Sequence, residues 1–140
     1  MKKDQNQIDH YKTMEKKIIN TKKSPAPIGP YNQAVFKGNT LFISGQIALD
    51  AESMKLNNRS INDETHQVMK NLKNILEQAN MNFNNVVKSS IFLSDMSLFE
   101  EVNNIYGSYL NPGNEPARET IAAKTLPMNV NVEISMIAII

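Results

Sequence analysis

The sequence predicts an α+β fold in which two helices cover one face of a single mixed β-sheet. Two segments place apolar residues at helical spacing, and six short runs are rich in β-branched and aromatic residues. Their order along the chain is β-β-β-α-β-α-β-β, which is typical of an α+β layer. The 140 residues, of which 41% are hydrophobic, suffice for one domain with its own core.

Three strands are predicted in the N-terminal part of the domain. Residues 16–20 form a short strand, and the proline-rich segment 24–30 after it is held extended. The runs 33–37 and 40–47 are separated only by a Gly-Asn dipeptide, which is typical of a β-hairpin. The sheet therefore begins with three strands before the first helix.

The clearest helix follows a polar loop. Ser60 can accept a hydrogen bond as its N-cap, with Asp63 three residues on, and apolar residues then recur at helical spacing. Asn80 is a suitable left-handed stop. We therefore expect a helix from about Ser60 to Ala79.

The C-terminal part is predicted to hold one more helix and three strands. A β-branched run at 86–93 predicts a strand. The second helix is expected to start with Ser97 as its cap and to bury an apolar face that includes Phe99. The last two strands, 118–124 and 130–140, flank a Leu-Pro step.

Two charged residues of these last strands are the best lead to function. Arg118 is one of two arginines among fifteen Lys and Arg residues, and a guanidinium can hold a carboxylate through two parallel hydrogen bonds. Glu133 is a lone acid in the most apolar stretch of the chain, where charges rarely lie without a partner or a role. If the two strands form a hairpin, the residues are near neighbours across it. Spacing then leaves two interpretations open, a cross-strand ion pair, or a divided site in which Arg118 holds a substrate carboxylate and Glu133 orients water.

Composition excludes several other kinds of chemistry. The chain has no cysteine, and hence no disulfide, thiolate metal site or cysteine nucleophile, which favours a reducing compartment such as the cytoplasm. His10 and His66 have no metal-ligand spacing, so no metal site is expected. The formal net charge of +1 gives no general attraction to nucleic acid. No apolar run approaches the ~18 residues that a membrane span needs.

The first residues are predicted to be separate from the domain. Residues 1–13 are polar and lack the apolar segment of a secretory signal, so we interpret them as a disordered extension of a domain spanning 14–140. Seven of the thirteen lysines fall within the first 23 residues, which makes this end locally basic.

Five short segments together resemble the RidA (YjgF-like) family of reactive intermediate imine deaminases. In chain order they are Ile28-Gly29-Pro30-Tyr31, Phe42-Ile43-Ser44-Gly45-Gln46-Ile47, Pro116-Ala117-Arg118, Leu126-Pro127 and Val132-Glu133-Ile134. Each segment alone is a weak signal, whereas the set, in this order and spacing, is specific. The similarity runs from about Met14 to the C-terminus.

The resemblance implies a chorismate-mutase-like α+β fold, assembled as a homotrimer with clefts at the subunit boundaries. It also implies hydrolysis of enamine and imine intermediates, such as 2-aminoacrylate and its imine tautomer, to 2-keto acids and ammonia, without a cofactor. The expected partners are a small imino or enamino acid substrate and further copies of the chain. Neither nucleic acid nor a membrane is an expected partner.

Residue roles carry over from the family by position. The catalytic pair would be Arg118, which binds the substrate carboxylate, and Glu133, which helps to place the attacking water. The residues implied to line the substrate site are Tyr31, Ser44, Gly45, Phe99 and Thr120. Many members have Cys at the position of Thr120, a second acid at that of Ser135 and a polar amide at that of Ser97. These departures are expected to alter substrate preference and to leave the chemistry in place.

Two other functions are weighed against the deaminase. An endoribonuclease or translation inhibitor would use the basic N-terminal lysines to bind RNA, with steep salt dependence, and the near-neutral overall charge speaks against it. A non-catalytic small-acid-binding or chaperone-like module would use the same clefts without turnover.

Overall fold

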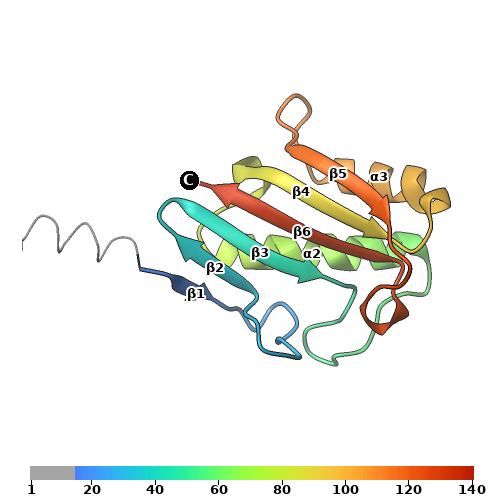
Figure 1. Cartoon of the computed structure of the whole chain (residues 1–140), viewed down its shortest axis with the longest axis horizontal. Coiled ribbons are helices and arrows are strands. Elements are labelled where there is room, and N and C mark those ends of the chain that lie inside the picture. The colour runs from blue at the N-terminus through green and yellow to red at the C-terminus, as the bar shows by residue number, and fades with distance from the viewer. Residues whose placement is uncertain (1–14) are drawn as a thin grey trace, which may run out of the picture.

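A computed structural model describes residues 15–140, so the extension predicted at 1–13 lies outside the described residues. A six-stranded sheet forms one layer, and two helices lie together behind it (Figure 1). The predicted α+β architecture, a mixed sheet with both helices on one face, is confirmed.

The elements lie within a few residues of their predicted bounds. The strands are β1 (Lys17–Ile19), β2 (Ala34–Lys37), β3 (Thr40–Gln46), β4 (Val86–Leu93), β5 (Ala117–Ala122) and β6 (Val132–Ile139). The helices are α2 (Ile61–Gln78) and α3 (Phe99–Ser108), and short 3-10 turns occur at η1 (Phe83–Asn85), η2 (Met96–Leu98) and η3 (Pro127–Asn129).

The hairpin considered for the last two strands is wrong. The strand order is β1-β2-β3-β6-β4-β5, in which β5 pairs in parallel with β4, and β6 lies on the other side of β4. Helix α3 makes the crossover that a parallel pair requires, and it leaves β5 at the edge of the sheet. The most apolar strand, β6, is then hydrogen-bonded along both edges, between β3 and β4.

Turn and cap chemistry explains where several elements begin and end. The predicted hairpin of β2 and β3 is confirmed, and Gly38 supplies its positive φ of 64°. Ser60 caps α2 by accepting from the backbone N–H of Asp63 at 3.0 Å. The predicted cap Ser97 is wrong, because the carboxylate of Asp95 accepts from the N–H of Ser97 at 2.7 Å and starts η2 there. Helix α3 then begins at Phe99 without a side-chain cap.

The core lies between the helices and one face of the sheet. On β6 the residues alternate, as a strand that is covered on one face requires. Those that face the helices and are buried are Val132, Ile134, Met136 and Ala138. Helix α2 contributes the fully buried side chains of Val68, Met69, Leu72, Ile75 and Leu76. This alternation sends Glu133 to the face away from the helices.

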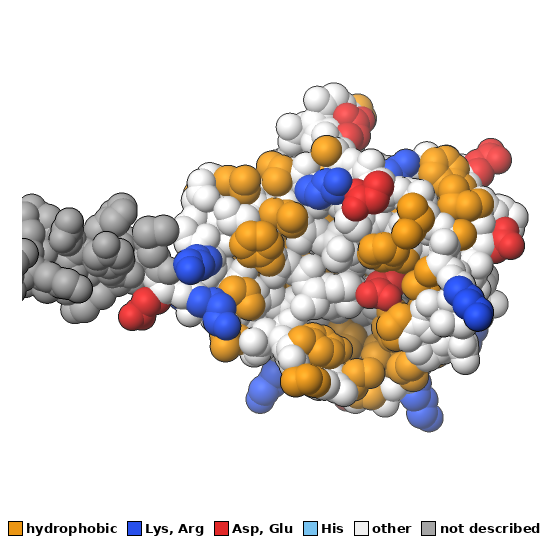
Figure 2. Space-filling view, viewed as in Figure 1, with side chains coloured by type: hydrophobic (Ala, Val, Ile, Leu, Met, Phe, Trp, Pro, Cys, Tyr) orange, Lys and Arg blue, Asp and Glu red, His pale blue; other side chains and the backbone are white. Residues whose placement is uncertain are grey.

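No helix of the described residues covers that second face of the sheet. It exposes large apolar side chains, with Ile18 52%, Phe42 50% and Ile121 50% exposed, and Figure 2 shows hydrophobic side chains in several patches across it. On the same face, Lys88 and Glu119 form an ion pair of 2.6 Å. Large apolar side chains gathered on one exposed face are typical of an interaction surface.

A buried polar network ties the loops around the end of β3 to helix α2. The amide of Asn71 is fully buried and donates to the carbonyl oxygens of Ile47 at 3.1 Å and Leu49 at 2.9 Å. Its backbone carbonyl accepts from the hydroxyl of Ser24 at 2.7 Å, and the carbonyl of Ser24 accepts in turn from Nε2 of Gln33 at 3.1 Å. One residue of α2, through its side chain and its backbone carbonyl, thus fixes two loops that carry no regular structure.

We expect Asn71→Ala to destabilise the protein by about 2–4 kcal/mol, because it leaves two buried carbonyl oxygens without a donor. The matched control is Asn74→Ala on the same helix, since Asn74 is only partly buried and donates one bond of 2.8 Å to the carbonyl of Lys23. The loss of unfolding free energy in Asn74→Ala should stay under about 1 kcal/mol. Urea unfolding at one protein concentration measures both free energies. Equal losses for the two variants would contradict the role given to Asn71.

Candidate functional site

A cleft of about 380 Å³ opens beside the end of β3, between the proline-rich loop, β3 and the first residues of β6. Four residues implied by the resemblance line it together: Tyr31, Ser44, Gly45 and Glu133. Apolar side chains surround them, including Ile28, Ile47, Leu49 and Pro127. A mostly apolar cleft with a few converging polar groups is a typical small-molecule site.

Backbone contacts hold Tyr31 and Ser44 in place. The phenol oxygen of Tyr31 accepts from the N–H of Ile28 at 3.3 Å, so the ring closes one wall of the cleft. The hydroxyl of Ser44 donates to the carbonyl of Asn32 at 2.6 Å. The bond to Asn32 is the only one that this hydroxyl makes among the described residues, so none of them activates it, and Ser44 is a structural part of the wall.

Gly45 is where the carboxylate of Glu133 lies against the backbone. A Cβ built on Gly45 would overlap Oε1 of Glu133 and lie 2.9 Å from its Cδ. The pairing of β3 with β6 changes register between Ile43 and Gln46, so a bulge opens the strand at this glycine. The carboxylate can approach the strand only because position 45 has no side chain.

Glu133 has the chemistry of a proton acceptor. Burial raises the pKa of its carboxyl above the usual range. No hydrogen bond to this carboxylate is found from any described residue, so both oxygens are free to bind water or a ligand. A half-buried carboxylate with a raised pKa in a cleft is a candidate general base.

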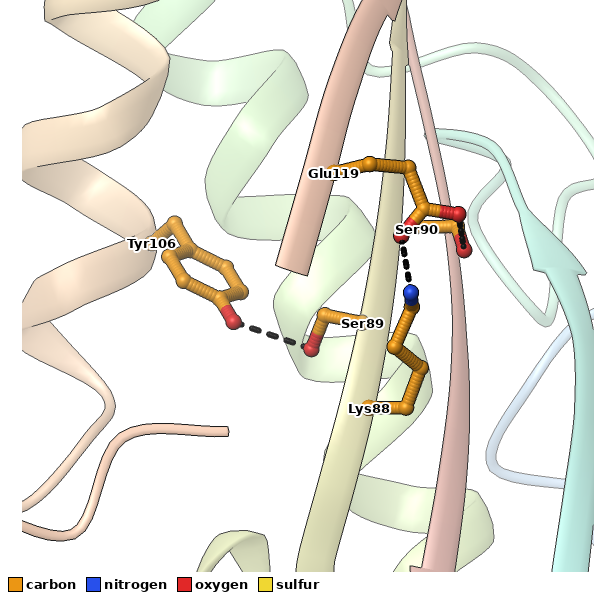
Figure 3. A network of polar contacts seen from close by, with 5 residues as sticks. All are labelled: Lys88, Ser89, Ser90, Tyr106 and Glu119. Atoms are coloured by element: carbon orange, nitrogen blue, oxygen red, sulfur yellow. Dashed lines mark hydrogen bonds and ion pairs between the residues drawn. The ribbon is translucent and has the colours of Figure 1, made fainter. Parts of the chain in front are cut away.

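Arg118 lies on the helix side of the sheet, at its β5 edge. Its Nη1 donates to Oδ1 of Asn103, and its guanidinium carbon lies 5.6 Å from the ring centroid of Phe99 and 5.3 Å from that of Tyr106. The hydroxyl of Tyr106 donates to that of Ser89 at 2.9 Å, which fixes the ring (Figure 3). Two rings and one amide thus orient the guanidinium.

The two charged residues lie on opposite faces of the sheet. Arg118 is in register with Ser89 of β4, whose buried side chain points toward α3, whereas Glu133 is in register with Phe92. Figure 3 shows both sides of β4, with Ser89 and Tyr106 on one side and the Lys88–Glu119 pair on the other. The cross-strand ion pair is therefore contradicted.

The predicted site residues fall into two separate groups within one chain. The cleft group is Tyr31, Ser44, Gly45 and Glu133. The arginine group holds the predicted residues Phe99, Arg118 and Thr120, together with Asn103 and Tyr106, which contact the guanidinium. Thr120 follows Arg118 on the same face of β5, and its hydroxyl oxygen is buried without a partner among the described residues. Each group thus offers polar atoms that have no partner among residues 15–140.

Asn103 and Tyr106 are residues of the arginine group that the sequence analysis missed. They lie four and seven residues after Phe99, on one face of α3. An asparagine on that otherwise apolar face is the signal that could have identified it. A polar residue there needs a partner, and Arg118 is one.

Within residues 15–140, no cluster of three or more His, Asp or Glu side chains could hold a metal ion. Among the same residues, no helix combines the length and apolar character of a membrane span.

Replacement of Gly45 by alanine is expected to displace the Glu133 carboxylate and to leave the protein folded, because the overlap is with the flexible end of a side chain. The control is Gly107→Ala, at an exposed position of helix α3, where a Cβ meets nothing within 4 Å. This change should stabilise the helix by about 0.5–1 kcal/mol. Crystal structures of the two variants give the carboxylate positions. An unmoved carboxylate in Gly45→Ala would refute the close contact.

Comparisons with known proteins agree with this geometry. The sequence profile of the family described as Endoribonuclease L-PSP matches residues 21–140. A mouse protein named 2-iminobutanoate/2-iminopropanoate deaminase is 45% identical over 124 residues, which span 89% of this chain and 91% of the mouse protein.

Two solved structures show the same fold. RidA from the Antarctic bacterium Psychrobacter sp. PAMC 21119 has a TM-score of 0.85 and 39% identity, over 89% of this chain and 99% of that chain. TdcF from E. coli with bound serine has a TM-score of 0.83 and 29% identity, over 89% of this chain and 98% of that chain. From the profile match and these relatives, we conclude that the chain belongs to the Endoribonuclease L-PSP family, the family of the RidA proteins.

Proposed function

We propose that the protein is a hydrolytic deaminase of small 2-imino acids and their enamine tautomers, and that it releases 2-keto acids and ammonia. The observation that carries this proposal is the carboxylate of Glu133, held half-buried over Gly45 with both oxygens free of partners among the described residues. Relatives named imine deaminases support the reaction type. The serine bound to E. coli TdcF supports a small acid with a nitrogen at C2 as the class of ligand.

We further propose that three copies of the chain assemble and that each active site is shared between two of them. The apolar face of the sheet, with Phe42 and Ile121 each 50% exposed, is suited to burial between copies. The arginine group lies at β5, the edge strand, where a neighbouring copy can reach it. Arg118 of one copy would then face the cleft of the next.

In this mechanism Arg118 binds the substrate carboxylate through two parallel hydrogen bonds and so fixes C2 of the imine. Asn103 and the rings of Phe99 and Tyr106 keep the guanidinium oriented. Thr120 has a free hydroxyl that would donate to the same carboxylate.

Glu133 accepts a proton from water while the water oxygen attacks C2, and passes this proton to the imine nitrogen, which gives a carbinolamine. Glu133 then accepts the proton of the carbinolamine hydroxyl and passes it to the amino nitrogen. The C–N bond breaks as the C2 carbonyl forms, and ammonia departs from the 2-keto acid. A pKa raised by burial suits a group that must both take and return a proton near neutral pH. Water is the sole co-reactant, so the proposed reaction uses no cofactor.

The family is described as an endoribonuclease family, so cleavage of RNA is the second candidate activity. The charged residue that lines the cleft is Glu133, and a carboxylate there repels a phosphate backbone. An RNase assay on the full chain and on a chain that lacks residues 1–13, run beside the imine assay at two salt concentrations, separates the functions. Saturable binding of a 2-keto acid without turnover of the imine would instead indicate the small-acid-binding module.

Arg118→Lys is expected to reduce kcat/KM about 10–100-fold, because a lysine keeps the charge but loses the second parallel hydrogen bond. The substrate is a 2-imino acid generated in situ by an amino-acid oxidase, and release of the keto acid is followed. The control is Arg59→Lys, at the other arginine, which is exposed in a loop. Near-wild-type turnover by Arg118→Lys would reject the carboxylate clamp.

The shared site predicts complementation between two variants of strongly reduced activity. Arg118→Ala keeps Glu133, and Glu133→Gln keeps Arg118, so mixed trimers formed by co-refolding should contain some complete clefts. Random mixing of equal amounts restores about one quarter of the clefts in a cyclic assembly. A mixture of Arg118→Ala with Arg118→Lys is the control and should show no gain. Absence of any gain in the first mixture, with exchange verified by mass spectrometry, would show that the cleft is not shared.

A further inference from the structure

Glu64 is a fully buried carboxylate that neither group of site residues includes. It lies in the first turns of helix α2 and is 0% exposed. Its Oε1 accepts from the backbone N–H of Asn131 at 2.6 Å and of Val132 at 3.2 Å, and its Oε2 accepts from the side-chain amide of Asn131 at 3.0 Å. A buried carboxylate that takes three donors from one segment binds that segment strongly.

The segment that Glu64 holds leads directly into Glu133. It begins with η3, whose first residue, Pro127, lines the cleft. Met128 and Asn129 then both have a φ of 54°, a left-handed conformation that non-glycine residues adopt only where their surroundings enforce it. The turn therefore depends on what fixes its ends.

A second contact fixes the same point from β4. The hydroxyl of Ser94 donates to Oδ1 of Asn131 at 2.8 Å, and the N–H of Ser94 donates to the backbone carbonyl of Asn131 at 3.0 Å. Asn131 is thus bonded to α2 through Glu64 and to the end of β4 through Ser94. Two residues later, the side chain of Glu133 points to the opposite face of the sheet.

We propose that Glu64 is a positioning residue for Glu133: by holding the backbone of Asn131 and Val132 from the helix side, it sets where the Glu133 carboxylate lies in the cleft. This inference rests on the catalytic role given to Glu133 under the proposed function. Glu64 touches no substrate and acts through the first residues of β6. The carboxylate of Glu133 must fit beside Gly45, so a small shift or rotation at Val132 moves it out of place.

Two substitutions test the contact. Glu64→Leu keeps a similar volume and removes every acceptor. Glu64→Gln keeps one acceptor oxygen, so it should retain most of the positioning of Glu133 and most of the wild-type activity. The matched control is Thr65→Val. Thr65 is the next residue of α2, is equally buried, and donates within the helix to the carbonyl of Ile61 at 2.7 Å. It therefore reports on the loss of a buried hydrogen bond that does not reach β6.

The kinetic readout separates positioning from stability. In the imine assay we expect Glu64→Leu to lower kcat about 10-fold or more, with KM within about 3-fold of wild type, because the carboxylate clamp is untouched. Thr65→Val should keep the wild-type kcat even where its Tm falls. In a Glu133→Gln background, Glu64→Leu should lower kcat no further, since the residue through which it acts is already lost.

A second readout does not depend on activity. The titration of the Glu133 side-chain carboxyl is followed by ¹³C NMR in wild type, Glu64→Leu and Thr65→Val. In Glu64→Leu the released carboxylate becomes solvated, so its pKa should fall toward the ordinary range, while Thr65→Val should titrate as wild type does. If Glu64→Leu does not fold, Asn131→Ala, which removes the side-chain donor and keeps the two backbone donors, takes its place with a smaller expected change.

The outcomes of the two readouts are distinct. A wild-type protein without imine hydrolysis would reject the proposed function, and the NMR titration would still decide whether Glu64 positions Glu133. An unchanged Glu133 titration together with a wild-type kcat in folded Glu64→Leu overturns the inference. A further fall of kcat in the Glu133→Gln background also overturns it, because Glu64 would then act by another route.

Discussion

The insertion of β6 between β3 and β4 is the constraint on which the rest of the structure depends. Its alternate residues Val132, Ile134 and Met136 are buried against the helices. Glu133 therefore points to the opposite face of the sheet. A shift of one residue in register would bury the carboxylate in the core and expose the apolar set. The position of the acid in the cleft is thus a consequence of how the sheet buries its most apolar strand.

The same alternation keeps Arg118 and the cleft apart within one chain. β5 and β6 flank β4 on opposite sides, and Arg118 of β5 and Glu133 of β6 point to opposite faces. Among residues 15–140, the cleft is lined by an acid and by no cation that could bind a carboxylate, while the arginine group has an oriented cation and no base. An apolar sheet face and an edge strand adjoin the two groups, so association of copies would both bury that face and join the complementary chemistry.

Local chemistry in the sequence predicted much of the fold. The Gly-Asn hairpin, the Ser60 cap and the left-handed Asn80 all depend on residues within a few positions, and each is found as predicted. The cap assigned to Ser97 was wrong because an aspartate two residues earlier binds the same N–H group. Competing acceptors of this kind cannot be ranked from propensity alone.

Long-range pairing was harder to predict than local structure. The hairpin of the last two strands assumed that neighbours in sequence are neighbours in the sheet, and the crossover of α3 overrides that assumption. Asn103 and Glu64 were missed for a related reason, since their partners, Arg118 and Asn131, lie 15 and 67 residues away. Pattern and resemblance could name Arg118, Gly45 and Glu133, but only the topology could show that the first lies apart from the other two.

The most direct measurement is a crystal structure of the assembled protein with a bound 2-keto acid such as pyruvate. The account predicts that the ligand carboxylate is hydrogen-bonded by Arg118 of one copy. Its C2 should lie within about 4 Å of a water held by Glu133 of another copy, as a general base requires. A ligand bound by residues of a single chain, or an Arg118 that faces solvent in every copy, would contradict the account.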